Sequence, residues 1–258
     1  MSYYQLRTVQ DDVPNAVYTL SPYQGVNADV GTTFEDIWRE GGVRVIPTAE
    51  DTISVVSTSA DDVADTGTGA WVVMFPYIKL AADGKYTDPT PEPDQYLQYE
   101  LNGLTDVTTD INSDTNVGLI VDRAFIRQVG TGGTNAGDIK IKVGSDVVCT
   151  IGAGKGIAEM AMGSIPRADG WKLGVNQIKP NIGTVVNNQI ITIELQAREN
   201  GFAWHTYHSI IVDNFHSAQA HTFDPPLALP GADDVRVQAK TSTGAAQVSV
   251  SIDFFIYK

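Results

Sequence analysis

The sequence predicts an all-β protein, built as one or two antiparallel β-sandwiches or as a barrel. Short segments of alternating apolar and polar residues recur at intervals of roughly 8–12 residues, the spacing typical of sandwiches and barrels. The loops between these segments are rich in Gly, Thr, Ser, Asp and Pro, which favour turns. No stretch shows a convincing 3.6-residue apolar period of an amphipathic helix.

One predicted strand is Ile190–Arg198, in which Ile191, Ile193, Leu195 and Ala197 alternate with Thr192, Glu194 and Gln196. The other predicted strands are Ile53–Val56, Trp71–Leu80, Gln95–Leu101, Val117–Val129, Ile139–Val143, Trp171–Ile178, Trp204–Val212, Val235–Lys240 and Val248–Tyr257. The segment around Glu35 ends at the pair Gly41-Gly42, which favours a short strand or a single turn over a helix. The proline-rich segment Phe223–Gly231 is interpreted as a rigid turn.

We expect three parts: an N-terminal arm (1–23), a first sandwich (24–162) and a second sandwich (163–258). The boundary is placed near Gly163, between a glycine-rich stretch and the turn at Pro166. The arm is rich in large apolar and aromatic residues, and in a monomer it would fray. We therefore predict that it lies on a neighbouring subunit, with these interface candidates: Tyr3, Tyr4, Leu6, Tyr18 and Tyr23.

Charge argues against nucleic acid as a partner. The chain of 258 residues has 31 acidic and 17 basic residues and a formal net charge of −14, so its surface repels phosphates. No run approaches 18 apolar residues, so we expect no membrane-spanning helix. The single cysteine, Cys149, lies in an apolar run and is predicted to be a buried thiol, which suits assembly in a reducing cytoplasm.

Two acidic segments are candidates for metal binding. Residues Asp110–Asn116 carry oxygen side chains at every second position, like the first ligands of a calcium loop. Thr115 replaces the expected glycine and Val121 the bidentate glutamate, so a polar loop is the favoured interpretation, with calcium as the alternative. The cluster Asp61, Asp62 and Asp65 is interpreted as a solvated turn.

The histidines do not predict a zinc site. His205 and His208 are three residues apart in a predicted strand and are expected on opposite faces. The sequence does not place His216 and His221 near them. The glycine-rich run Ile151–Gly156 lacks the spacing of a phosphate-binding loop and is interpreted as a tight β-turn.

No set of residues predicts an active site or a cofactor. There is no G-x-S-x-G motif and no ordered Ser, His and Asp set, and the many carboxylates make a chance glycosidase-like pair uninformative. The tryptophans Trp71, Trp171 and Trp204 alternate with aliphatic residues, which favours core or subunit-interface positions over a sugar-stacking platform. We therefore expect a non-enzymatic protein.

Several phrases follow one another along the chain. The first is NADVGTTFEDIW, at Asn27–Trp38, followed by Gly41-Gly42. The later phrases are Pro47–Asp62, Thr66–Ala70, Leu101–Gly103, Arg123–Ile126, Asn135–Ile139, Ile151–Gly156 and His221–Leu227. In these phrases and in their order the chain resembles a family of structural proteins of tailed bacteriophages that is common in aquatic phages. The resemblance runs from about Gly25 to the end, and departs at Lys79–Asp94 and Gly163–Gly170.

This resemblance implies jelly-roll-like sandwiches and a virion component with no catalytic residues or cofactor to carry over. It implies a decoration (cement) protein on the capsid surface, assembled in the host cytoplasm and bound between capsomers. The expected partners are the major capsid protein and further copies of this chain, as a trimer or a dimer.

Two other functions stay open at the level of sequence. A tail-, baseplate- or fibre-associated protein that binds host glycans would present an exposed aromatic groove, for instance near Trp204 and Tyr207. A glycan-cleaving virion enzyme would require two carboxylates that converge in a cleft.

Overall fold

The computed structural model is all-β. It describes residues 7–8, 17–19, 23–43, 45, 51–76, 78–80, 96–109, 118–121, 123–164, 172–183, 189–199, 202–213, 220–229 and 234–257. Within these ranges every regular element is a β-strand and every strand pairing is antiparallel. The predicted fold class is therefore confirmed. None of these segments forms a helix with the length and apolar character needed to cross a lipid bilayer.

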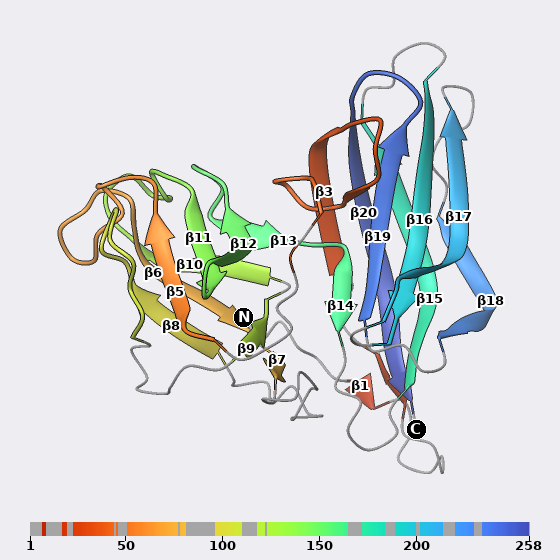
Figure 1. Ribbon diagram of the computed structural model, residues 1–258, viewed down its shortest axis with the longest axis horizontal. Coiled ribbons are helices and arrows are strands. Elements are labelled where there is room, and N and C mark those ends of the chain that lie inside the picture. The colour runs from red at the N-terminus through yellow and green to blue at the C-terminus, as the bar shows by residue number, and fades with distance from the viewer. Residues whose placement is uncertain are drawn as a thin grey trace. The chain divides into compact units, whose positions relative to one another are not determined.

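The chain divides into two compact units (Figure 1). Unit 1 combines Met1–Val43 with Met160–Lys258, and unit 2 is the continuous stretch Arg44–Glu159. This grouping differs from the expected order of an arm followed by two consecutive sandwiches. The difference arises because strand β3 (Tyr23–Val30) pairs with the last strand, β20 (Ala246–Tyr257), and not with its neighbours in sequence.

Unit 1 contains two antiparallel sheets. The first has the order β1-β2-β20-β15-β18, with β3 also on β20, and the second has the order β14-β19-β16-β17, with β4 also on β19. The remaining strands of unit 1 are β1 (Arg7–Thr8), β2 (Val17–Thr19), β4 (Glu35–Asp36), β14 (Met162–Ser164), β15 (Lys172–Ile182), β16 (Ile190–Arg198), β17 (His205–Asp213), β18 (His221–Leu229) and β19 (Asp234–Thr241).

The strand order of unit 1 is that of a jelly roll. In a jelly roll the strands B to I form two sheets, B-I-D-G and C-H-E-F, through two Greek keys. Taking β3 as B and β20 as I gives the first sheet as β3-β20-β15-β18, and the second sheet follows with β19 as H, β16 as E and β17 as F. The C position is shared by β4 and β14, which both pair with β19.

Unit 2 is inserted into this C strand. Strand β4 pairs with Gln238 and Ala239 of β19, and β14 continues along the same strand opposite residues 236 to 234. Between them the backbone N–H of Ala161 donates to the carbonyl oxygen of Ile37 at 3.0 Å, and Ile37 and Ala161 both hydrogen-bond the backbone of Val237. The two halves therefore act as one strand, although the whole of unit 2 lies between them in the sequence.

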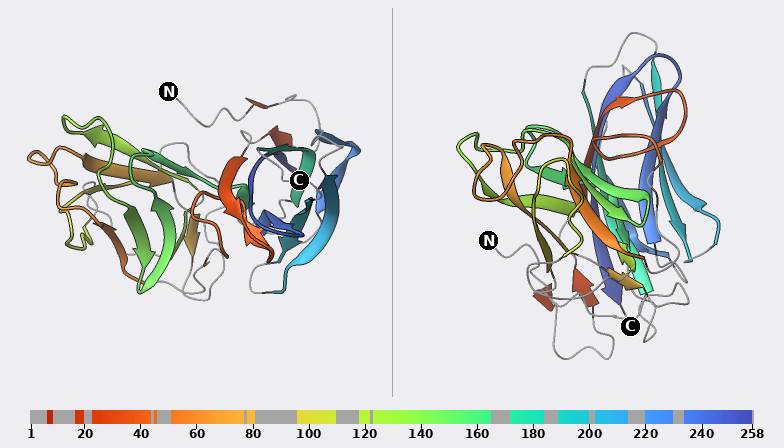
Figure 2. Two further views of the ribbon diagram at one scale, coloured as in Figure 1. Left: turned by 90° about the horizontal axis from the view of Figure 1, so that it is seen from above. Right: turned by 60° about the vertical axis from the view of Figure 1, so that its left-hand side comes forward.

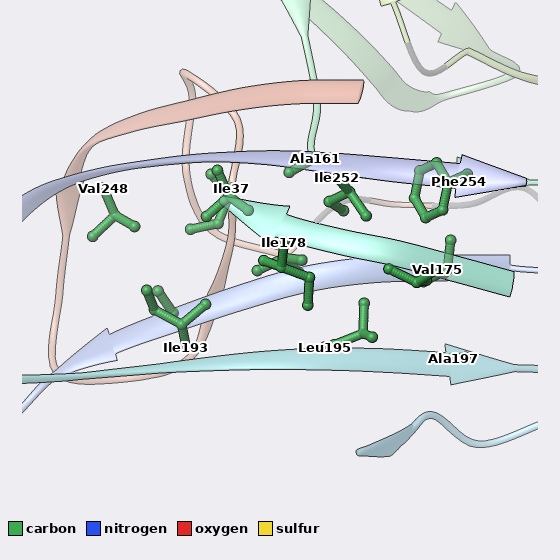
Figure 3. Packing of buried hydrophobic residues seen from close by; sticks show 14 of the residues in the cluster. Ile37, Ala161, Val175, Ile178, Ile193, Leu195, Ala197, Val248, Ile252 and Phe254 are labelled. Carbon is green, nitrogen blue, oxygen red and sulfur yellow. The ribbon is translucent and has the colours of Figure 1, made fainter. Parts of the chain in front are cut away.

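The core of unit 1 lies between its two sheets (Figure 3). Val175 and Ile178 of β15 face Ile193 and Leu195 of β16, and all four are buried. Strand β16 shows the cause, since its inward residues are aliphatic and its outward residues after Ile190 are polar. The same alternation buries Val248, Val250, Ile252 and Phe254 of β20.

Unit 2 has three small antiparallel sheets, with the orders β13-β10-β6-β8, β12-β11-β5 and β7-β9. Its strands are β5 (Ile53–Ser57), β6 (Ala70–Pro76), β7 (Ile78–Leu80), β8 (Tyr96–Glu100), β9 (Gly118–Ile120), β10 (Arg123–Val129), β11 (Ile139–Val143), β12 (Asp146–Ile151) and β13 (Ile157–Glu159). Alternate residues of β8 and β11 are buried, as the sequence predicts. Cys149 is buried in β12, which confirms the expectation for this residue. Figure 2 gives two further views of the strands.

Two local expectations are wrong or incomplete. Residues His221–Leu229 form strand β18, and not the rigid turn expected from their prolines. The strand tolerates Pro225 and Pro226 because it is a sheet edge, and its register against β15 shifts between Val175 and Gln177. The described part of the N-terminal arm also belongs to a sheet, since Val17–Thr19 pair with β20.

Candidate functional site

Most of the residues that carry the family resemblance gather in two places, one in each unit, while the phrase His221–Leu227 lies in β18. In unit 1 the phrase Asn27–Trp38 forms the end of β3, the turn after it and the first half of the split C strand. In unit 2 six phrases meet around the buried side chains of Asp62 and Asn135.

Glu35 closes the turn between β3 and β4. Its carboxylate accepts hydrogen bonds from the backbone N–H of Gly31 (2.9 Å), the backbone N–H of Gly42 (3.1 Å) and the Asn27 side-chain amide (3.1 Å). Burial alone would raise the pKa of the Glu35 carboxyl, but these donors outweigh it, so the pKa lies below its ordinary value. The charged form is thus held by the local backbone.

Asp36 links the split strand to its neighbour. Its Oδ1 accepts a hydrogen bond from Gln238 Nε2 at 2.9 Å and lies 3.3 Å from Arg236 Nη1. All three side chains are buried, on the outward face of β19. Burial lowers the pKa of Arg236, the charge of Asp36 opposes this, and the nearby charge of Arg198 adds to it.

Trp204 stacks with two guanidinium groups. The Cζ atoms of Arg236 and Arg198 lie 4.1 and 4.6 Å from the centroid of its ring, and Arg198 Nε also donates to Asp234 Oδ2 at 2.8 Å. These are cation–π distances. The ring therefore packs against charged groups of its own unit and is partly buried, and the core or subunit-interface position expected for it stays a prediction. Trp71 is likewise tied to its own loop, through Nε1 to the Gly67 carbonyl oxygen at 2.7 Å.

Asp62 is the centre of the loop cluster in unit 2. Its carboxylate is fully buried and accepts hydrogen bonds from four donors: Ser57 Oγ (2.5 Å) and the backbone N–H groups of Ala70 (2.6 Å), Ala136 (2.8 Å) and Gly137 (2.9 Å). These donors come from three of the resembling phrases. The expectation that Asp62 belongs to a solvated turn is wrong, whereas its neighbours Asp61 and Asp65 are exposed.

Asn135 extends the cluster to the glycine-rich turn. Its Nδ2 donates to the carbonyl oxygens of Gly137 (2.7 Å) and Gly152 (2.9 Å), and its Oδ1 accepts from the N–H of Gly156 (3.0 Å). Two more phrases join through the backbone, because Gly103 N–H donates to the Asp62 carbonyl oxygen and Ile126 N–H to that of Gly156. Six phrases that are scattered in the sequence thus form one hydrogen-bonded cluster, which we call the Asp62 cluster.

The run Ile151–Gly156 forms a tight turn, as predicted. Lys155 N–H donates to the Gly152 carbonyl oxygen at 3.1 Å, and Gly154 and Gly156 have φ angles of 72° and 70°. Its N–H groups at Gly156 and Ala153 are taken up by Asn135 Oδ1 and Asp138 Oδ1. An anion would have to displace these side-chain oxygens to reach the turn.

The histidines come together differently from the prediction. A register shift between Leu195 and Gln196 places both His205 and His208 opposite inward-facing residues of β16, so their expected placement on opposite faces is wrong. The ring near His208 is His221 of β18, at 4.2 Å between centroids, and Phe223 packs against both. Burial lowers the pKa of His208, and the charge of His221 lowers it further.

Several predicted residues lie outside the ranges that the structure describes. They are the candidate calcium loop Asp110–Asn116, Trp171, His216 and the arm residues Tyr3, Tyr4 and Leu6. Tyr18 and Tyr23 lie in β2 and β3, where their backbones pair with Ile256 and Ile252 of β20. The interface role of these five arm residues stays a prediction. Across the described ranges, no group of three His, Cys, Asp or Glu residues is placed to hold a metal ion.

Both places have the chemistry of structural anchors. The carboxylates and amides of Asp62, Asn135 and Glu35 bind backbone groups of their own unit. Sequence reasoning missed Asp62 and Asn135 as anchors because a buried Asp and an exposed Asp look alike in a polar loop. The available signal was their place inside the resembling phrases.

No protein-family model matches the chain, and no curated protein matches it. Among solved structures, the chain is similar to one described as "The Triple Jelly Roll Fold and Turret Assembly in an Archaeal Virus", at 8% identity and a TM-score of 0.26. That similarity covers 94% of this chain and 56% of the other. The chain is also similar to a structure described as "Structure of infectious bursal disease virus Gx strain", at 10% identity and a TM-score of 0.24. That similarity covers 98% of this chain and 73% of the other. The jelly-roll assignment of unit 1 is based on its own strand order.

Proposed function

We propose that this protein is a non-enzymatic structural protein of a tailed-bacteriophage virion. More narrowly, we propose a capsid decoration protein that binds the head shell between capsomers. It assembles in the host cytoplasm with the major capsid protein and with further copies of itself.

The observation that carries this proposal is the role of the resembling phrases. In unit 2 they build the Asp62 cluster, and in unit 1 they build the split strand and the turn held by Glu35. The residues in these phrases fix loops and strands, because their buried polar groups are hydrogen-bonded to backbone groups. Such residues favour a rigid scaffold over a reaction centre. A jelly roll with an inserted β unit is such a scaffold, and jelly rolls are widespread among viral capsid proteins.

Electron cryo-microscopy of the particle that carries this protein, with icosahedral averaging, tests the proposal. We expect density for both units at two-fold or three-fold positions on the shell. Absence from the averaged shell, together with presence of the protein in purified particles, would contradict the decoration role and favour a tail or host-binding role. Absence of the protein from purified particles would contradict any virion role.

The role of the N-terminal arm in binding the shell is better tested by substitutions than by deletion of residues 1–23. Such a deletion would remove β2 and the first residue of β3, which pair with β20. Substituting Tyr3, Tyr4 and Leu6 with serine leaves those pairings in place. If the arm anchors the protein, the triple variant should fold normally but lose occupancy on particles, whereas wild-type occupancy would show that the anchor lies elsewhere.

A further inference from the structure

Strand β17 has an open edge. In the sheet order β14-β19-β16-β17 it is the last strand, and among the described residues it pairs only with β16. One row of its backbone N–H and C=O groups therefore has no strand beside it in the part of the chain that the structure describes. His205–Asp213 has nine residues, which is long for an unprotected edge strand, since proteins usually keep edge strands short or protected.

The two sheets of unit 1 end, on this side of the sandwich, in edge strands of different sequence. Edge strand β18, in the other sheet, contains Pro225 and Pro226 and a register shift, which are the features that block strand addition. Strand β17 has the sequence HTYHSIIVD, without proline, lysine, arginine or glutamate. Its register shift lies toward its start, between the residues opposite Leu195 and Gln196. The rest of β17 runs in regular register to Asp213.

The outward face of β17 carries exposed apolar side chains at this edge. Ile211 lies opposite Thr192, whose neighbours Ile191 and Ile193 face the core, so Ile211 points outward and its side chain is 69% exposed. Ile190 shares that face one strand inward and is 46% exposed. Tyr207, four residues before Ile211, is 40% exposed. Exposed apolar residues that gather at an open edge indicate a surface that is covered in the working protein.

We propose that β17 pairs with β17 of a second copy of this chain, antiparallel and about a two-fold axis at Ser209. This register is self-complementary. Tyr207 of each copy lies opposite Ile211 of the other, an aromatic–β-branched pair of the kind that stabilises neighbouring strands. The one carboxylate of the strand, Asp213, lies at its end, so in this antiparallel register it meets the start of the other copy's strand and not the other Asp213. Pairing joins the two C-H-E-F sheets into one continuous sheet.

The charge of the chain favours this edge over the rest of the surface as a contact between copies. Two chains of net charge −14 repel each other, and this repulsion is smallest where the meeting segments carry little charge. In the β17 pair only the terminal Asp213 is acidic. The dimer does not rest on the virion proposal, because it is a property of the isolated protein.

The first test adds a charge at the two-fold axis. Ser209 is exposed, and Ser209→Lys places two lysines directly opposite each other in the proposed pair. The matched control is Thr192→Lys, which adds the same charge to the same outward face, but on the neighbouring strand β16. By sedimentation and light scattering near neutral pH, we expect wild type and the control to be dimers of the 27.8 kDa chain and Ser209→Lys to be a monomer. Monomeric wild type at tens of micromolar, or a dimeric Ser209→Lys, would overturn the proposal.

The second test reports the register directly. Opposed residues of antiparallel strands have Cα atoms about 4.5–5.5 Å apart, within the range that a disulfide spans. Ser209→Cys should therefore form a covalent dimer under mild oxidation, whereas Thr192→Cys should not. Circular dichroism confirms that each variant is folded. A dimer that persists without cross-linking through Cys at position 209 would show that another surface is used.

Discussion

The backbone N–H of Ala161 donates a hydrogen bond to the carbonyl oxygen of Ile37 at 3.0 Å. Met160 and Trp38 form an antiparallel bridge directly beside it. These contacts close the break in the C strand at the point where unit 2 is inserted. Ordinary sheet hydrogen bonds therefore join the two halves of the C strand at the point where the chain leaves and re-enters unit 1.

Gly25 lies against the hydrogen bond between Ile37 and Ala161, where only a glycine fits. A Cβ atom added to it would lie 1.9 Å from the Ile37 carbonyl oxygen and 2.4 Å from the Ala161 nitrogen, and both are backbone atoms that cannot turn away. We expect Gly25→Ala to lower the free energy of unfolding of unit 1 by about 1–3 kcal/mol, the usual cost of overpacking. Gly183→Ala is the control, because its new Cβ would meet only the flexible side chain of Gln247. Equal stabilities of the two variants in urea unfolding would contradict the close approach.

Removal of the Asp62 carboxylate should destabilise unit 2. Asp62→Ala leaves three buried donors without an acceptor, namely the backbone N–H groups of Ala70 and Gly137 and the Ser57 hydroxyl, and each buried unsatisfied donor costs about 1–3 kcal/mol. We expect a loss of at least about 3 kcal/mol and faster hydrogen exchange in residues 135–137. Asp61→Ala, which removes the exposed neighbouring carboxylate, should change stability by less than about 0.5 kcal/mol. A mild effect of Asp62→Ala would mean that water replaces the carboxylate.

Trp204 is expected to stabilise the fold and not to bind a glycan. Trp204→Ala removes the ring on which Arg198 and Arg236 stack, and we expect a loss of about 1–2 kcal/mol. Phe202→Ala, in the exposed segment before it, should have little effect. If Trp204→Ala instead leaves stability unchanged and abolishes binding in a glycan screen, the ring is a ligand platform.

Acid should weaken the F–G side of the jelly roll through His208. The pKa of His208 in the fold lies below its ordinary value, and that of the unfolded chain is about 6.5, so the unfolded state binds the proton more tightly. This contribution to stability is therefore present above about pH 6.5 and is lost as the pH falls through the folded-state pKa. We expect His208→Gln to reduce the fall in Tm between pH 7.5 and pH 5. An unchanged pH dependence would show that His208 does not report on folding.

The sequence predicts the strands well where one face is buried. Ile139–Val143 and Ile190–Arg198 match the observed strands residue for residue, because strict alternation has no other stable interpretation in a sheet. It fails at Tyr23–Val30, YQGVNADV, whose glycine and polar residues show no alternation. That strand is specified by its partner β20, which lies at the other end of the chain.

The candidate site was predictable only as a set of phrases. Nothing in the local sequence of Asp62 separates it from Asp61, since both lie in the same polar loop. Burial of Asp62 depends on donors from Ala136 and Gly137, more than seventy residues away, and such contacts are not encoded in any short window. The order of the units was missed for the same reason, because an insertion is defined by long-range strand pairing.

The insertion also sets an order for synthesis and folding. All strand pairings of unit 2 join residues between Ile53 and Glu159, so they can form once that continuous stretch has left the ribosome. The jelly roll cannot be completed then, because β2, β3 and β15 all pair with β20, the last strand to be made. The nascent chain must carry β3 and β4 as unpaired segments while unit 2, which follows them in the sequence, folds. The inserted unit can therefore be complete before the enclosing jelly roll, whose synthesis begins earlier and finishes later.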